Sequence, residues 1–127
     1  MIRTESLTKY FGTRPAVRDL SFRIEDTEVV GFLGLNGAGK TTTLRMLAGL
    51  LAPSNGTIEI DSEPLHAERS IAVRRRIGFL PERPPLYDEM GVQEFLEFAA
   101  RLRGVREDRA GAAASEAMEQ TGLGDHR

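Results

Sequence analysis

The segment GLNGAGKTTT, residues 34–43, constrains the fold of this chain more than any other stretch. It lies between the apolar segments EVVGFL and LRMLAGLL. Glycines let successive backbone N–H groups turn towards one anion, and a following helix adds unsatisfied N–H groups and the positive end of its dipole. The pattern G-x-x-x-x-G-K-[ST] is matched by Gly34, Gly39, Lys40 and Thr41. It predicts a phosphate-binding loop, in which Lys40 meets the β- and γ-phosphates and the Thr41 hydroxyl ligates Mg²⁺.

Hydrophobic periodicity predicts strands and one helix first, then helices alone. The predicted strands are residues 2–11, 16–25, 28–34, 57–60 and 77–80, of which 28–34 and 77–80 are apolar enough to be buried on both faces. The predicted helices are residues 40–50, 67–76, 92–104 and 106–123. The apolar face of the first helix is Leu44, Leu47, Ala48 and Leu51; that of the third is Val92, Phe95, Leu96, Ala99 and Leu102. Gly104 and Gly122 are expected to end the last two helices.

Composition excludes several classes of protein. The formal net charge of −2 argues against a general nucleic-acid binder, which would carry a basic surplus. Because the chain has no cysteine, it has no disulfide framework and no thiolate metal site. The N-terminal segment lacks the apolar core of a signal peptide, and no apolar run reaches membrane-spanning length. We therefore expect a cytosolic chain without membrane insertion of its own, which meets a membrane only through a partner.

The motifs together resemble a known family. The stretches LTKYFGTRPAVRDLSFRI, NGAGKTT and RRRIGFLPE look like the first half of the ATP-binding subunit of an ABC transporter, closest to the ABC-2 export type. The resemblance implies an α/β P-loop NTPase (RecA-like) core with an N-terminal antiparallel β-subdomain and the start of an α-helical subdomain, in truncated form. Residues 1–82 would form the core part and 83–127 the beginning of the helical subdomain. ATP and Mg²⁺ are the implied ligands.

The resemblance also assigns roles by position. An aromatic residue just before the first turn stacks on adenine in this family, which matches Phe11, although the adjacent Tyr10 is an alternative. The implied phosphate-binding residues are Asn36, Gly37, Ala38, Gly39, Lys40, Thr41 and Thr42, with Thr42 near the α-phosphate. Lys40 and Glu82 would be catalytic, and Thr41 and Glu82 would hold the metal.

Two positions depart from the family pattern. Glu82 stands where the family usually has a glutamine that faces Mg²⁺ and the attacking water. A glutamate oxygen can still ligate Mg²⁺, but it cannot donate a hydrogen bond once it is ionised. Thr27 stands where glycine is common, in a turn that carries no chemistry.

The resemblance implies partners too. Residues 81–91, PERPPLYDEMG, match the region that touches the transmembrane permease, which would place the protein on the cytoplasmic side of the plasma membrane. Hydrolysis in the family needs a second ATP-binding subunit, and also motifs that would follow Arg127. We therefore expect the 127-residue polypeptide by itself to bind ATP weakly or not at all and to hydrolyse none measurably. The alternatives are a soluble ABC-type ATPase acting on ribosomes or nucleic acid, and a non-hydrolysing nucleotide-binding fragment.

Overall fold

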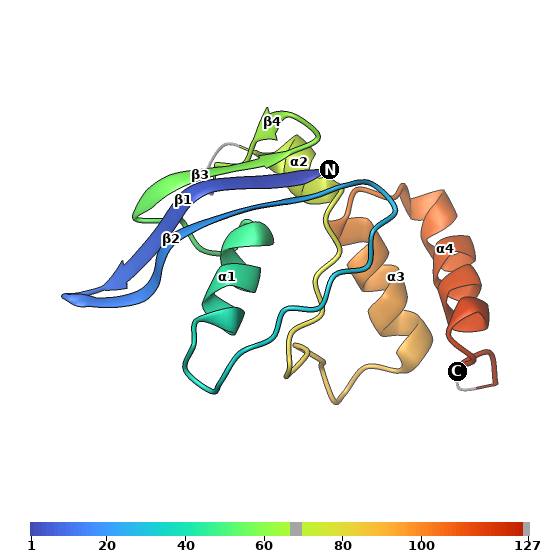
Figure 1. Ribbon diagram of the computed structural model, residues 1–127. Coiled ribbons are helices and arrows are strands. Elements are labelled where there is room, and N and C mark those ends of the chain that lie inside the picture. The colour runs from blue at the N-terminus through green and yellow to red at the C-terminus, as the bar shows by residue number, and fades with distance from the viewer. Residues whose placement is uncertain (67–69, 126–127) are drawn as a thin grey trace. The chain divides into compact units, whose positions relative to one another are not determined.

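The computed structural model describes residues 1–66 and 70–125, and the chain forms two compact units, Met1–Phe79 and Leu80–Arg127 (Figure 1). The domain boundary between residues 82 and 83 stays a prediction.

The first unit is built on a four-stranded sheet in the order β2-β1-β3-β4, with all neighbours antiparallel. The strands are β1 (Ile2–Phe11), β2 (Arg14–Ile24), β3 (Asn55–Ile60) and β4 (Glu63–Pro64). Ile2 lies opposite Ile24 on one side and Ile60 on the other. A turn with left-handed Asp61 and Ser62 joins β3 to β4, as in a two-residue hairpin of type I′. The antiparallel β-subdomain expected from the sequence is confirmed.

Helix α1 (Lys40–Leu47) supplies the other side of this unit's core (Figure 1). The core residues are Leu7, Val17, Met46, Ile58, Ile60, Leu65 and Val73, the last from the short helix α2 (Ile71–Arg75). The buried face of α1 includes Met46, whereas Leu44, which the sequence pattern placed on that face, is 43% exposed. The prediction that the helix runs to Leu50 is also wrong, because Gly49 takes a left-handed conformation and ends it.

The two strands expected to be buried on both faces do not form. Residues 28–34 and 77–80 have no regular structure, and Val29, Leu33 and Leu80 are almost completely exposed. A buried strand is held by hydrogen bonds to strands on both sides. Among the described residues, the sheet uses only β1 to β4, so neither segment has a strand to pair with. Phe32 alone of its segment stacks on the sheet, with its ring centroid 6.0 Å from that of Phe22.

The second unit contains helices α3 (Val92–Leu102) and α4 (Glu107–Gln120), which pack against each other. Both predicted helices are thus confirmed. The buried residues of α4 are Ala110, Ala114 and Met118, spaced four apart on one face. Gly104 and Gly122 follow the two helices in left-handed conformation and donate to carbonyls of the last turn, as the sequence predicts. Leu102 is 71% exposed, so it does not share the half-buried face of α3.

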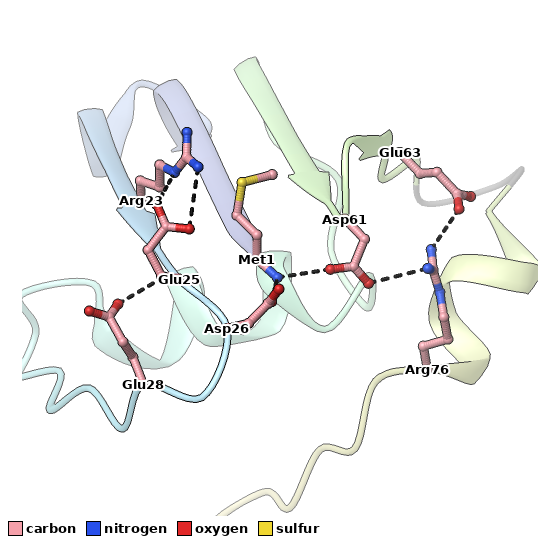
Figure 2. Close-up of polar contacts among 8 residues, drawn as sticks. All are labelled: Met1, Arg23, Glu25, Asp26, Glu28, Asp61, Glu63 and Arg76. Carbon is pink, nitrogen blue, oxygen red and sulfur yellow. Dashed lines mark hydrogen bonds and ion pairs between the residues drawn. The ribbon is translucent and has the colours of Figure 1, made fainter.

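An ionic network joins the ends of the strands in the first unit (Figure 2). The Met1 amine donates to Asp26 and to Asp61, the latter at 2.8 Å. Arg76, after α2, bridges Asp61 at 3.2 Å and Glu63 at 3.0 Å. Hydrogen bonds to Asp26 and then Asp61 raise the pKa of the Met1 amine above its ordinary 8.0. The hydrogen bond from the same amine is the main cause that lowers the pKa of Asp61 below 3.8.

The network predicts that Asp61→Asn changes the stability of the folded protein in a pH-dependent way. Asparagine, like aspartate, tolerates the left-handed conformation of this turn. Because folding lowers the pKa of Asp61, its contribution is present above about pH 4 and is lost as the pH falls through the folded pKa. Because folding raises the pKa of the Met1 amine, that group's contribution is lost as the pH rises above its folded pKa. Thermal unfolding of the two proteins should therefore differ at pH 6 and converge towards pH 3. An equal difference at both values would show that the turn, and not the charge, is affected.

The backbone of Thr27, a position where the family commonly has glycine, is strained. Its φ is +66°, a region in which a β-branched residue is a true outlier. The left-handed backbone conformation costs an L-residue about 1–2 kcal/mol, which glycine avoids. Glycine also raises the conformational entropy of the unfolded chain, so the net gain in stability from a change to glycine is smaller.

We expect Thr27→Gly to raise the free energy of unfolding by about 1 kcal/mol, measured by chemical denaturation. Thr27→Ala is the matched control, because it retains the Cβ and so most of the strain. A gain for alanine as large as that for glycine would mean that the Thr27 side chain, and not the backbone, is unfavourable.

Candidate functional site

The loop before α1 is shaped by glycines and by its contact with β2. Gly37 and Gly39 have φ of +82° and +90°. A Cβ on Gly39 would lie 2.3 Å from the backbone oxygen of Ala16 and 3.0 Å from a methyl group of Val17. Only glycine can therefore stand at position 39, where the loop rests directly on the strand. Within the loop, the amide of Ala38 donates to the carbonyl of Leu35 at 3.1 Å.

The N-terminus of α1 is suited to an anion. No side chain caps it, and its first turn contains no acidic residue. Thr43 is buried and uses both its amide and its hydroxyl on the carbonyl of Gly39, at 2.8 and 2.9 Å. Thr41 is exposed and Thr42 half-buried, so these two remain accessible beside the helix N-terminus. The dipole and the amides of the first turn would stabilise a phosphate placed here.

Lys40 lies over the start of the same loop. Its ammonium donates to the carbonyls of Gly34 and Leu35, the latter at 2.8 Å. The positive charge is thus held beside the loop amides, where it adds to the positive potential of the helix N-terminus. The structure therefore brings together the loop, Lys40, Thr41 and Thr42, as the sequence pattern predicts.

The two aromatic candidates lie at the end of β1, next to the turn into β2. Phe11 is 54% exposed and Tyr10 38% exposed. The ammonium of Lys9 lies over the Phe11 ring, 5.6 Å from its centroid. Lys9 is in turn the cross-strand partner of Val17, whose methyl group lies next to Gly39. The sequence pattern gives no role to Lys9, although it and Lys40 are the two lysines of the chain.

Glu82 belongs to the second unit and is exposed in a bend. Its pairing with Thr41 around a metal ion stays a prediction. In residues 1–66 and 70–125, no group of three or more histidines, cysteines or acids is placed to hold a metal.

Leu86 and Tyr87 follow in the same proline-rich segment. They are 60% and 53% exposed, and the Tyr87 ring contacts Phe95 and Phe98 of α3 with centroids 6.3 and 5.9 Å away. The segment is thus anchored on α3 while it presents apolar surface.

No helix in the described part of the chain is long and apolar enough to cross a membrane.

A glycine-rich loop that leads into a helix N-terminus and is followed by a lysine and two threonines is the pattern of a P-loop nucleotide-binding protein. The family model described as ABC transporter matches residues 17–127. The chain therefore belongs to the ABC transporter family, and it corresponds to part of an ATP-binding subunit.

Relatives of known sequence agree. The chain is 45% identical over 123 residues to the uncharacterized ABC transporter ATP-binding protein YxlF of Bacillus subtilis, covering 97% of this chain and 40% of that protein. It is 38% identical to the bacitracin transport ATP-binding protein BcrA of Bacillus licheniformis, covering 97% of this chain and 39% of the relative. The chain thus spans about 40% of the length of these relatives.

Solved structures agree on the fold. An ATP-binding subunit of an ABC transporter superposes with a TM-score of 0.82 and 29% identity, over 99% of this chain and 52% of that one. A dimeric ATP-binding cassette in a post-hydrolysis state, bound to ADP and Pi, superposes with a TM-score of 0.81 over 96% of this chain and 57% of that one. At 22% identity, this second likeness concerns the fold alone. The expected ABC cassette fold is confirmed.

The contact between Gly39 and β2 yields a matched pair of variants. Gly37→Ala introduces only left-handed strain, because nothing lies within 4 Å of its Cβ, and we expect it to cost about 1–2 kcal/mol of stability. Gly39→Ala adds a clash with the Ala16 carbonyl and should cost clearly more, with loss of nucleotide binding. Denaturant unfolding and nucleotide titration measure both effects. Equal costs at the two positions would contradict the close approach of loop and strand.

Proposed function

We propose that this protein binds MgATP through residues 34–42 and, in its complete form, hydrolyses it to drive transport by a separate membrane permease of the ABC-2 export type. The observation that carries the proposal is the loop around Gly39, which joins a lysine, a helix N-terminus free of acidic residues and two accessible threonines. Membership of the ABC transporter family supports the same function.

The phosphate-binding residues in this proposal are Asn36, Gly37, Ala38, Gly39, Lys40, Thr41 and Thr42. Loop amides and the helix N-terminus hold the phosphate oxygens, and Lys40 leaves its two carbonyl partners to meet the β- and γ-phosphates. By the family resemblance, Thr41 and Glu82 would hold Mg²⁺. When bound, Mg²⁺ supplies neutralisation of the charge that develops on the transferred phosphoryl group.

Phe11, rather than Tyr10, is the aromatic that we propose to stack on adenine. Phe11 is the more exposed of the two, and the Lys9 ammonium lies over its ring. The cross-strand partner of Lys9 is Val17, which lies next to Gly39 of the loop. Tyr10 instead has its backbone amide tied to the hydroxyl of Ser54. Base–aromatic stacking needs one accessible ring face and tolerates any base.

Glu82 would act in catalysis as an acceptor only. Its carboxylate oxygens would ligate the metal and accept a hydrogen bond from the attacking water, whereas an ionised carboxylate cannot donate one. Hydrolysis also requires charge neutralisation at the γ-phosphate from beyond this chain. A second ATP-binding subunit is the proposed source, in line with the dimeric state of one structural relative.

The permease is the second proposed partner. The segment 81–91 would contact it, because it presents exposed Leu86 and Tyr87 on a base anchored to α3. Aromatic residues and arginine are enriched at protein interfaces, and Arg83 lies in the same segment. The protein would then lie on the cytoplasmic face of the membrane, held there by the permease.

Nucleotide titration and ATPase assays of the complete protein with its permease test this function. Lys40→Ala should reduce hydrolysis at least 100-fold, because transition-state stabilisation by the lysine is lost. Arg45→Ala is the control, since it removes a positive charge from the exposed side of the same helix. Full turnover in Lys40→Ala, or equal losses in both variants, would overturn the proposal.

A further inference from the structure

Lys9 has two contacts that tie the end of β1 to the region around α1. Its ammonium donates to the carbonyl of Ala52 at 2.7 Å and lies over the ring of Phe11, 5.6 Å from its centroid. The Ala52 carbonyl follows α1 in the chain, so the lysine bridges the β1–β2 hairpin and the segment after the helix. It is half-buried, whereas the ring that it contacts is mostly exposed.

Backbone bonds fix the same end of the hairpin. The amide of Ser54 donates to the carbonyl of Thr8 at 2.8 Å, and the amide of Tyr10 donates to the hydroxyl of Ser54 at 3.0 Å. On the other strand, the carbonyl of Ala16 meets Gly39 at the start of α1. The hairpin is therefore attached at both ends of the phosphate-binding helix, which fixes the backbone of Phe11 relative to the loop.

The backbone attachments leave the ring of Phe11 unfixed. An exposed phenylalanine on a strand populates more than one χ1 rotamer, and it would lose that freedom when a base stacks on it. A cation above one face of the ring favours a single arrangement through attraction to the ring quadrupole. Because the cation occupies one face, the other face stays available to a planar ligand.

We propose that Lys9 is a positioning residue for base recognition: its ammonium, anchored on the Ala52 carbonyl, holds the Phe11 ring ready to stack on the adenine of the nucleotide. This inference rests on the proposed role of Phe11. Lys9 itself contacts neither base nor phosphate. It acts on the selectivity for a nucleotide over a bare polyphosphate, and not on hydrolysis once the nucleotide is bound.

The test compares the affinities of the complete protein for MgATP and for inorganic triphosphate with Mg²⁺, by calorimetric titration. Both ligands engage the loop and Lys40, but only ATP carries a base. Lys9→Met keeps the length of the side chain and removes the charge. We expect it to lower the ratio of the two affinities about twofold to fivefold, the range of an exposed cation–π contact. Lys9→Arg should restore the ratio, and kcat at saturating ATP should stay unchanged.

Three further variants make each outcome decisive. Arg18→Met removes a charge from an exposed position of the same hairpin and should leave the ratio unchanged. Lys9→Gln keeps a donor and serves if the methionine variant fails to fold. Phe11→Ala should lower the ratio more than any change at Lys9.

If Phe11→Ala lowers the ratio but neither Lys9→Met nor Lys9→Gln does, the role of Lys9 is overturned while the stacking of Phe11 stands. If Phe11→Ala leaves the ratio unchanged, the proposed stacking itself fails. A loss of equal size for both ligands in Lys9→Met would mean that the lysine supports the loop and not the ring, which also overturns the inference.

Discussion

The approach of Gly39 to the carbonyl of Ala16 is the contact on which the site depends. It leaves no room for a side chain, so the phosphate-binding loop and β2 are in backbone contact. The start of α1 is thereby fixed against the sheet, and Thr43 secures it by bonding the carbonyl of the same glycine. The sheet, the loop and the helix N-terminus are thus held together by direct contacts, and in the proposed function this arrangement would preorganise the loop amides for a polyphosphate.

Features that depend on neighbours in the chain could be predicted from the sequence. Strands β1 and β2 and helices α3 and α4 follow from local periodicity, turn residues and capping glycines, and the loop follows from a pattern whose spacing encodes its geometry. The segments 28–34 and 77–80 could not be predicted correctly, because an apolar run becomes a strand only where other strands hydrogen-bond to it.

Contacts between particular side chains could not be predicted from the sequence either. The contact of Lys9 with Phe11 depends on irregular pairing of β1 and β2, where the register shifts between Lys9 and Tyr10. Such bulges change which residues share a face of the sheet, so the alternation of apolar and polar residues does not predict which side chains are neighbours there. The face of α1 was predicted in part. Ala48 is buried and Leu47 and Leu51 pack against the core as expected, but Leu44 is exposed, and Thr43 and Met46 are buried in addition. An eight-residue helix offers too few turns for its apolar pattern to define one face completely.

The pairing of β1 with both β2 and β3 also bears on how the protein is made. All the strands of this sheet come from residues 2–64, so the support for the loop is complete before the segment after α2 leaves the ribosome. During synthesis, the apolar stretch that carries Val29 and Leu33 would stay exposed beside an already folded sheet. Such a stretch is a binding site for chaperones and a nucleus for aggregation.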